Sequence, residues 1–151
     1  MEIVFKKVPL EDIEIVYKLY CEIEGVEATI KDIEKAKEIY KNKILPRDSY
    51  TYAGYIDNNI VATVNVYKNW QMWPTDLDDP FVHLECVMVS PNYQGKGIGT
   101  ELIINIVTLV YNEGVTYTIG QSPVEAMQHI FYKAGLTETN CKDFRKNYDK
   151  E

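Results

Sequence analysis

The segment from Val82 to Val107 constrains the fold of this chain more than any other. An apolar, strand-like run, VHLECVMV, leads into the turn SPNY, then QGKGIGT and the helix-like run ELIINIV. Gly95, Gly97 and Gly99 lack β-carbons, so successive backbone N–H groups can approach an anion where a helix begins. The segment therefore predicts a strand, a turn and a helix around a phosphate site, although glycines alone also fit a sharp turn without a ligand.

Two familiar phosphate-binding motifs do not match this turn. The ATP-type P-loop has Ser or Thr directly after Gly-Lys as a magnesium ligand, whereas Gly97 follows Lys96 here. The dinucleotide fingerprint would need its third glycine at Thr100 or at Leu102. A binder of nucleotide phosphates is therefore the least favoured alternative.

Composition sets the general class of the protein. With 151 residues, 46% of them hydrophobic, residues 1–151 are expected to form a single domain with a substantial core. No run of 18 or more apolar residues occurs, and the opening MEIVFKKVPLED lacks the apolar region of a signal peptide. We therefore expect a cytoplasmic protein without a membrane span.

The charge and the cysteines exclude some partners. Sixteen basic and 23 acidic residues give a formal charge of −7, which argues against nucleic acid or an anionic membrane as a partner and leaves cationic small molecules. Cys21, Cys86 and Cys141 follow no Cys-x-x-Cys spacing, which favours reduced thiols. Strand alternation predicts Cys86 as a small buried residue that faces away from Glu85.

The hydrophobic pattern predicts an α/β domain with a mixed sheet and the order β-α-α-β-β-β-α-β-α-β. Gly25 is expected to end the first helix and Thr29 to cap the second. Asp57-Asn58-Asn59 predicts the turn of an antiparallel hairpin. The expected strands are 3–8, 50–56, 60–67, 82–89, 115–119 and one or two short ones in the tail, of which 144–148 is the better candidate. The expected helices are 9–24, 29–44, 98–113 and 122–133.

The glycine turn also carries a family resemblance. Gln94-Gly95-Lys96-Gly97-Ile98-Gly99 matches Gln/Arg-x-x-Gly-x-Gly/Ala, the acyl-CoA pyrophosphate motif of the GNAT superfamily of N-acetyltransferases, and Val87-Met88-Val89-Ser90-Pro91 resembles that family's preceding strand. The resemblance runs from about Ile3 to Leu136 and is most specific in this region. It implies the order of elements given above, with a central sheet that splays after the fourth strand.

The resemblance also implies a ligand site. In the family, the pantetheine arm binds the backbone of the splayed strand and the glycine turn holds the pyrophosphate. It implies acetyl-CoA as cosubstrate and no metal; homodimers are frequent in such folds. The implied cofactor-binding residues are Val87, Met88, Val89, Gln94, Gly95, Lys96, Gly97, Ile98, Gly99, Thr100 and Phe131.

Attack of an amine on a thioester needs a base for the amine, a donor for the oxyanion and a proton for the thiolate. His83 and Glu85 are two apart on the motif strand, so uniform alternation puts both on one face together with Val87. Family members have a base at either position; we favour Glu85, with His83 as the alternative. The backbone N–H of Val87 is the expected oxyanion donor.

The closing helix departs from the family pattern. Many members have a Tyr four residues before the helix-ending glycine as the acid for the thiolate, whereas Phe131 precedes Gly135 here. Tyr132 is adjacent and is retained as a candidate acid, although one residue rotates a side chain by about 100°. The family's Asn on this helix is replaced by Val124, so protonation of the thiolate by water is the alternative.

The acceptor is expected to bind at the loop before the motif strand. Aromatic rings and carboxylates can hold a cationic amine, although a solvated loop anchored by its tryptophans fits equally well. Polyamine, amino sugar, amino acid and protein amine all remain open as acceptors. The candidate residues are Trp70, Trp73, Asp76, Asp78 and Asp79.

We therefore expect an N-acetyltransferase that moves an acetyl group from acetyl-CoA to the primary amine of a small molecule or peptide, by direct attack in a ternary complex. The alternative is an acyl-CoA-binding module with weak or lost catalysis, which the replacement of the family's Tyr by Phe131 favours.

Overall fold

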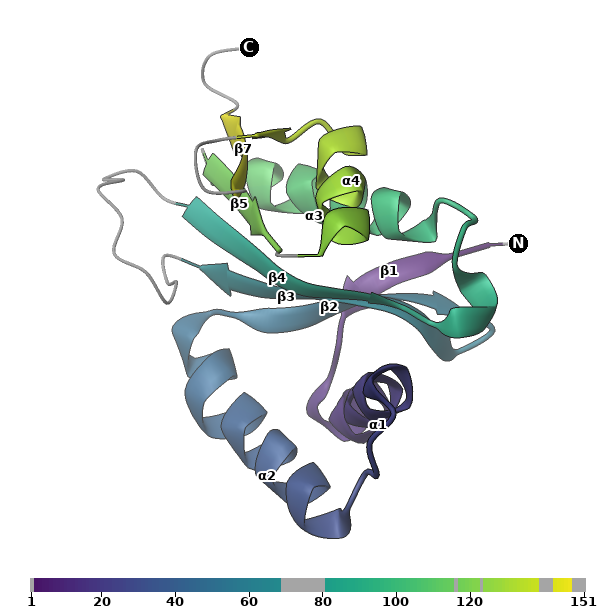
Figure 1. The fold of residues 1–151 in the computed structure, drawn as a ribbon. Coiled ribbons are helices and arrows are strands. Elements are labelled where there is room, and N and C mark those ends of the chain that lie inside the picture. The colour runs from purple at the N-terminus through teal and green to yellow at the C-terminus, as the bar shows by residue number, and fades with distance from the viewer. Residues whose placement is uncertain (1, 69–80, 116, 123, 139–142, 148–151) are drawn as a thin grey trace.

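A computed structural model describes residues 2–68, 81–115, 117–122, 124–138 and 143–147 of the chain (Figure 1). The elements follow the predicted order, and the tail contributes two short strands. They are β1 (Val4–Lys7), α1 (Ile13–Glu24), α2 (Ile30–Ile39), β2 (Tyr50–Ile56), β3 (Asn59–Lys68), β4 (Phe81–Val89), α3 (Ile98–Asn112), β5 (Tyr117–Gln121), α4 (Glu125–Lys133), β6 (Thr137–Glu138) and β7 (Asp143–Asn147).

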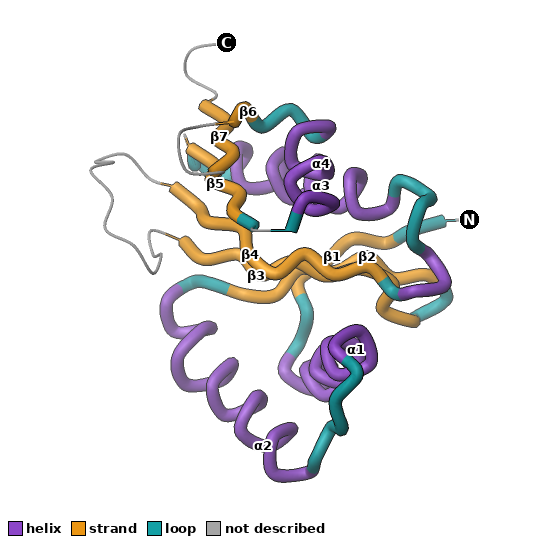
Figure 2. Tube along the Cα trace, in the orientation of Figure 1, coloured by secondary structure: helices purple, strands orange, loops and turns teal. Residues whose placement is uncertain are grey.

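The seven strands form one sheet in the order β1-β2-β3-β4-β5-β7-β6 (Figure 2). Neighbouring strands run antiparallel except for β4 and β5, which are parallel and joined through α3. Helices α1 and α2 lie on one face of the sheet, and α3 and α4 lie on the other (Figure 1). The predicted mixed α/β sheet is thus confirmed.

The predicted helix-ending glycine, helix cap and hairpin turn are all present in the structure. Gly25 ends α1 in the left-handed conformation at φ 70°. Thr29 caps α2, because its hydroxyl accepts a hydrogen bond from the Asp32 N–H at 3.2 Å. Asp57 and Asn58 both have positive φ angles, which matches the tight hairpin turn between β2 and β3.

The main core lies between α3 and the sheet. α3 is apolar on its inner side, and these side chains are fully buried against valines and leucine from β3 and β4. Each such residue contributes about 1.5 to 3 kcal/mol by leaving water. The central members are Leu102, Ile103, Ile106 and Val110 of α3 with Val64, Val66, Val82 and Leu84 of the sheet.

Tyr40 fastens the second helix to the sheet on the opposite face. Its hydroxyl donates to the Val8 carbonyl at 2.7 Å and accepts from the Thr51 N–H at 3.1 Å. Both partners are backbone groups at the start of the sheet, so the buried hydroxyl satisfies them and fixes the end of α2.

In the described part of the chain, no helix has the length and apolar character needed to cross a bilayer.

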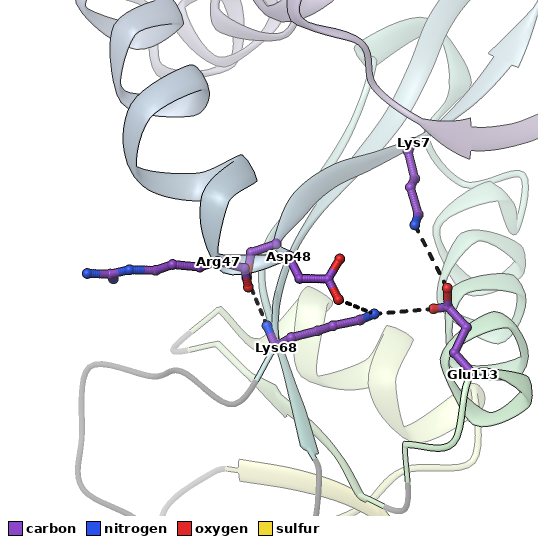
Figure 3. A network of polar contacts seen from close by, with 6 residues as sticks. Lys7, Arg47, Asp48, Lys68 and Glu113 are labelled. Carbon is purple, nitrogen blue, oxygen red and sulfur yellow. Dashed lines mark hydrogen bonds and ion pairs between the residues drawn. The ribbon is translucent and has the colours of Figure 1, made fainter.

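A charged network joins the end of α3 to β1 and β3 (Figure 3). Lys68 Nζ lies 3.0 Å from Asp48 Oδ2 and 3.7 Å from Glu113 Oε1, and Lys7 Nζ lies 3.8 Å from the second oxygen of Glu113. The Lys68 side chain is only 16% exposed, so it is the most sheltered cation of this group. The network therefore ties the end of α3 to the ends of β1 and β3.

Changing Lys68 to Met is expected to lower the free energy of unfolding by about 1 kcal/mol, because two carboxylates lose their shared, sheltered cation. Urea unfolding measures the change. Lys18→Met is the matched control, since Lys18 pairs with Glu14 on the exposed side of α1 and should change stability by less than about 0.5 kcal/mol. Equal losses in both variants would contradict a stabilising network.

Candidate active site

The glycine turn after β4 forms an open loop at the N-terminus of α3. Gly95 and Gly97 have φ angles of 76° and 78°, a left-handed conformation that side chains rarely adopt. Gly97 is the N-cap of α3, so the first N–H groups of the helix lie beside it. The sequence predicted Gly95 and Gly97 as part of a phosphate site. Their backbone conformation explains why both positions hold glycine.

A pocket of about 380 Å³ lies between this loop and α4. Of the predicted cofactor-binding residues, Val89, Gln94, Gly95, Gly97, Ile98, Gly99 and Thr100 line it. Val87, Met88, Lys96 and Phe131 are not among the lining residues. Lys96 instead has its ammonium 5.5 Å from the centre of the Tyr93 ring. We refer to this pocket as the cradle.

One side of the cradle was missed by the sequence reasoning. Helix α4 contributes Ala126, Met127, His129, Ile130 and Lys133 to the lining. Ala126, His129 and Lys133 follow helical spacing, so the signal was present in the sequence but needed the position of α4 against the loop. His129 and Lys133 give the cradle two basic side chains in a chain of net negative charge.

Gly99 brings α3, β4 and α4 close together. A β-carbon at this position would meet Ile130 Cδ1 at 2.9 Å and Val89 Cγ2 at 3.2 Å. Gln94 closes the loop onto the strand, because its side-chain amide donates to the Val89 carbonyl at 3.1 Å. The loop is therefore fixed at both ends, and its open N–H groups match an anionic group such as a pyrophosphate.

Strand β4 separates from β5 halfway along its length. Phe81 to Leu84 pair with Tyr117 to Gly120, and the β4–β5 pairing ends there. On its other side β4 continues beside β3 as far as Ser90, whose N–H donates to the Val61 carbonyl at 2.8 Å. The predicted splay after the fourth strand is confirmed, and the second half of β4 has an edge that β5 does not cover.

A β-bulge interrupts β4 at this point. Thr63 and Asn65 of β3 are two residues apart, but their partners Met88 and Glu85 are three apart. Cys86 is the extra residue and has a φ angle of 56°. A bulge of this kind bends the strand and reverses the alternation beyond it.

The bulge corrects two sequence expectations. Val87 does not share the face of His83 and Glu85, because the extra residue turns it to the side of Val89 and the α3 core. Cys86 was expected to be buried, but it is exposed. Uniform alternation, the premise of both expectations, does not hold across an inserted residue.

His83 and Glu85 remain together on the face covered by α1 and α2. His83 Nε2 lies 3.5 Å from Glu85 Oε1. His83 is fully buried, whereas the Glu85 side chain is 34% exposed. Glu85 can therefore reach solvent, while His83 lies behind it in the core.

The two aromatic candidates on α4 lie away from the cradle. Phe131 is fully buried against Gly120 of β5, where an added β-carbon would come within 2.7 to 2.9 Å of the ring. Tyr132 is 65% exposed and lines neither the cradle nor the cleft described below. The predicted acceptor residues Trp70, Trp73, Asp76, Asp78 and Asp79 lie outside the described residues.

The conformation of Cys86 gives a stability prediction. Cys86→Gly should leave the free energy of unfolding within about 1 kcal/mol of wild type, because relief of the left-handed strain offsets the greater freedom of glycine when unfolded. Cys86→Val should lower it by about 1 to 2 kcal/mol, because a β-branched residue fits a positive φ poorly. Urea unfolding distinguishes them, and a valine variant as stable as the glycine variant would argue against the bulge.

Comparison with known proteins agrees with this geometry. Residues 13–136 match the model of a family described as the acetyltransferase (GNAT) family. No curated protein matches the chain.

Solved structures of similar fold extend over almost the whole chain. Aminoglycoside acetyltransferase AAC(6')-Ib in complex with coenzyme A and kanamycin has a TM-score of 0.80 at 17% identity, over 98% of this chain and 96% of that chain. A predicted acetyltransferase with acetyl-CoA from Clostridium acetobutylicum has 0.70 at 17%, over 92% of each. An N-acetyltransferase from Staphylococcus aureus Mu50 has 0.74 at 11%, over 97% and 99%. At such identities the likeness concerns the fold.

Proposed function

Because the chain belongs to the GNAT acetyltransferase family, we propose that it transfers the acetyl group of acetyl-CoA to the primary amine of a small molecule. The supporting observation is the position of two cavities at the uncovered edge of β4. Val89 lines the cradle on one face of the sheet, and its neighbour Met88 lines a cleft on the other face. A donor and an acceptor on opposite faces can meet at this edge in one ternary complex.

The cradle fits the cosubstrate on observations of its own. Left-handed glycines expose the loop N–H groups, the N-terminus of α3 favours negative charge, and His129 and Lys133 add basic groups opposite. Gly95 to Thr100 would hold the pyrophosphate, and the uncovered backbone of β4 beyond Leu84 would hold the pantetheine arm. When bound, acetyl-CoA supplies a thioester whose C–S bond breaks as the amine nitrogen bonds to the acetyl carbon.

Glu85 takes the proton that the amine must lose. Its carboxylate is half-exposed on the acceptor face and can receive this proton directly or through one water molecule. His83 positions the carboxylate from behind and is too buried to meet the amine itself. The backbone N–H groups at the bulge are the donors available for a developing oxyanion, which requires no side chain.

The thiolate takes its proton from water in this proposal. Neither Phe131 nor Tyr132 lines the cradle, so the acid that many family members carry on this helix has no counterpart at those positions. The same observation supports a second candidate function, a CoA-binding module without turnover. Measuring CoA release with a thiol reagent and a panel of amines separates the two, because the module would bind acetyl-CoA yet release no thiol.

Two glycine variants test the cradle. Gly97→Ala should weaken acetyl-CoA binding by about tenfold or more, because the loop N–H groups shift from their anion-binding arrangement. Gly25→Ala is the matched control, since Gly25 also has a positive φ with nothing near its β-carbon position but ends α1 far from the cradle.

Both variants should lose similar stability, about 1 to 2 kcal/mol, from the same left-handed strain. Calorimetric titration with acetyl-CoA gives the affinities. Equal affinity in the two variants would place the cosubstrate elsewhere.

A further inference from the structure

The cleft on the acceptor face has an unusual composition for a site that must receive an amine. It has a volume of about 490 Å³ and lies between the strands β2, β3 and β4 and the two helices α1 and α2. A volume in this range suits a small molecule. None of the described residues that line it carries a formal charge, and several are tyrosines.

Aromatic rings form the helix side of this cleft. Tyr17 and Tyr20 of α1 stack with ring centroids 6.1 Å apart, and the wall continues with Ile39 at the end of α2 and Tyr40 just after it. Tyr20 and Ile39 remain 40% and 38% exposed, although both are large apolar side chains. A ligand with an aromatic body would cover the surface that the protein itself leaves open.

Polar groups gather on the sheet side. The Thr51 hydroxyl donates to Asn65 Oδ1 at 2.9 Å, and Asn65 lies opposite Glu85 in the β3–β4 pairing. Burial and the Glu85 charge raise the pKa of Tyr67 to about 12, so this phenol stays protonated beside the carboxylate. The strands therefore carry the hydroxyls of Thr51 and Tyr67, the amide of Asn65 and the carboxylate of Glu85.

One carboxylate, that of Glu85, lies at the end of the cleft where Cys86 is found. Glu85 directly precedes Cys86 in β4 and lies opposite Asn65 of β3, and both of these neighbours line the cleft. Cys86 lines it where the β4 bulge lies. Negative charge at one end and uncharged aromatic walls along the rest give the cleft a direction.

We infer that the acceptor is a primary monoamine with an aromatic body, bound with its ring against Tyr17 and Tyr20 and its amine toward Glu85. This inference rests on the proposed function and names its substrate class. A polycation such as an aminoglycoside or a polyamine would have to bring further charges against an uncharged lining, which is unfavourable without partners. A single amine meets a single charged end, and a cation near a tyrosine face gains further attraction.

Turnover of three probes tests this class. With 2-phenylethylamine, kcat/KM should exceed that with kanamycin or spermidine by about tenfold or more, a difference of about 1.4 kcal/mol. A higher kcat/KM with kanamycin or spermidine would overturn the inference and leave the acetyltransferase proposal intact. No thiol release with any amine would instead count against the proposed function, and the binding measurement below then decides the inference alone.

Protection of Cys86 measures binding without catalysis. Cys86 is exposed at the charged end of the cleft, whereas Cys21 is buried, so iodoacetamide modification can be followed at the Cys86 peptide by mass spectrometry. Saturating 2-phenylethylamine should slow this modification about fivefold or more, and kanamycin at the same concentration should not. Unchanged modification with 2-phenylethylamine, or stronger protection by kanamycin, would overturn the inference.

A pair of charge variants locates the binding site. Tyr20→Lys puts a cation on the cleft wall and should raise KM for 2-phenylethylamine, and reduce its protection of Cys86, by about fivefold to tenfold. Ile15→Lys changes an exposed residue of the same helix that does not line the cleft, and should behave as wild type. Acetyl-CoA affinity should be equal in both. Equal behaviour of the two variants toward the amine would place the acceptor outside the cleft.

Discussion

Replacing Glu85 by Gln is expected to lower kcat by about 100-fold to 1,000-fold, because the isosteric amide cannot accept the amine proton. The amide keeps the shape of the side chain, so the affinity for acetyl-CoA should change by less than about twofold, and the melting temperature by little. Steady-state rates from thiol release, with affinity from calorimetry, separate these quantities.

Two further variants make this result interpretable. Glu38→Gln removes a carboxylate from the exposed side of α2 and should keep wild-type turnover. His83→Gln should have a smaller effect on kcat than Glu85→Gln, since His83 is buried behind the carboxylate and, in our proposal, acts only by positioning it. If His83→Gln abolished turnover while Glu85→Gln kept it, the base would be His83 and our assignment would be wrong.

The largest stability effect is expected at Gly120. A β-carbon there would meet three atoms of the Phe131 ring at 2.7, 2.8 and 2.9 Å, and the fully buried ring has no room to move aside. Gly120→Ala should lower the free energy of unfolding by about 2 to 3 kcal/mol. For a chain of this size the melting temperature would fall by roughly 5 to 10 °C.

Gly54→Ala is the matched control for this change. Gly54 is also a strand glycine without a positive φ, but its β-carbon would meet side-chain atoms of Ile3 and Phe5 no closer than 3.2 Å, so the expected loss is smaller. The double variant Gly120→Ala with Phe131→Leu should recover part of the loss, because the smaller side chain removes the overlap. A Gly120→Ala variant as stable as Gly54→Ala would contradict the tight packing of Phe131.

Phe131 packs where β4 and β5 separate. Its ring fills the space over Gly120 in the strand that leaves β4 just beyond this point, so it supports the splayed sheet from within the core. A tyrosine at position 131 would place its hydroxyl in that core unless α4 shifted. The Phe that stands at position 131 in place of the family's Tyr therefore has a packing role in this structure.

Much of the fold could be predicted because its signals are local. Gly25, Thr29 and the Asp57–Asn58 turn each act within one turn of the chain, and the structure confirms all of them. The order of elements followed from hydrophobic periodicity. The splay of β4 from β5 was expected from the family resemblance, which rests mainly on one six-residue motif and the strand before it.

The site was predicted less completely, because it depends on contacts between distant segments. The bulge at Cys86 shifts the alternation of β4, and nothing in the residue types of VHLECVMV indicates an inserted residue. His129 and Lys133 reach the cradle only through the packing of α4 against the glycine loop. The cleft combines two helices with three strands, so its tyrosines had no common sequence signal.

The two cavities match the charges of the two proposed ligands, an anionic cosubstrate and an amine, in a chain with a net charge of −7. The cradle gathers backbone N–H groups and the basic side chains of α4 on one face of the sheet. The opposite face carries the partly exposed Glu85 beside the cleft. The local charges differ in sign between the two faces, and the overall charge does not decide binding at either.

Calorimetric titration of the wild-type protein with acetyl-CoA, beside ATP and NAD under identical conditions, tests the central claim most directly. We predict one acetyl-CoA site per chain and binding at least about tenfold tighter than that of ATP or NAD, because the loop lacks the residues of both nucleotide motifs. Absence of acetyl-CoA binding, or tighter binding of either nucleotide, would contradict the account of the cradle and with it the proposed acetyltransferase activity.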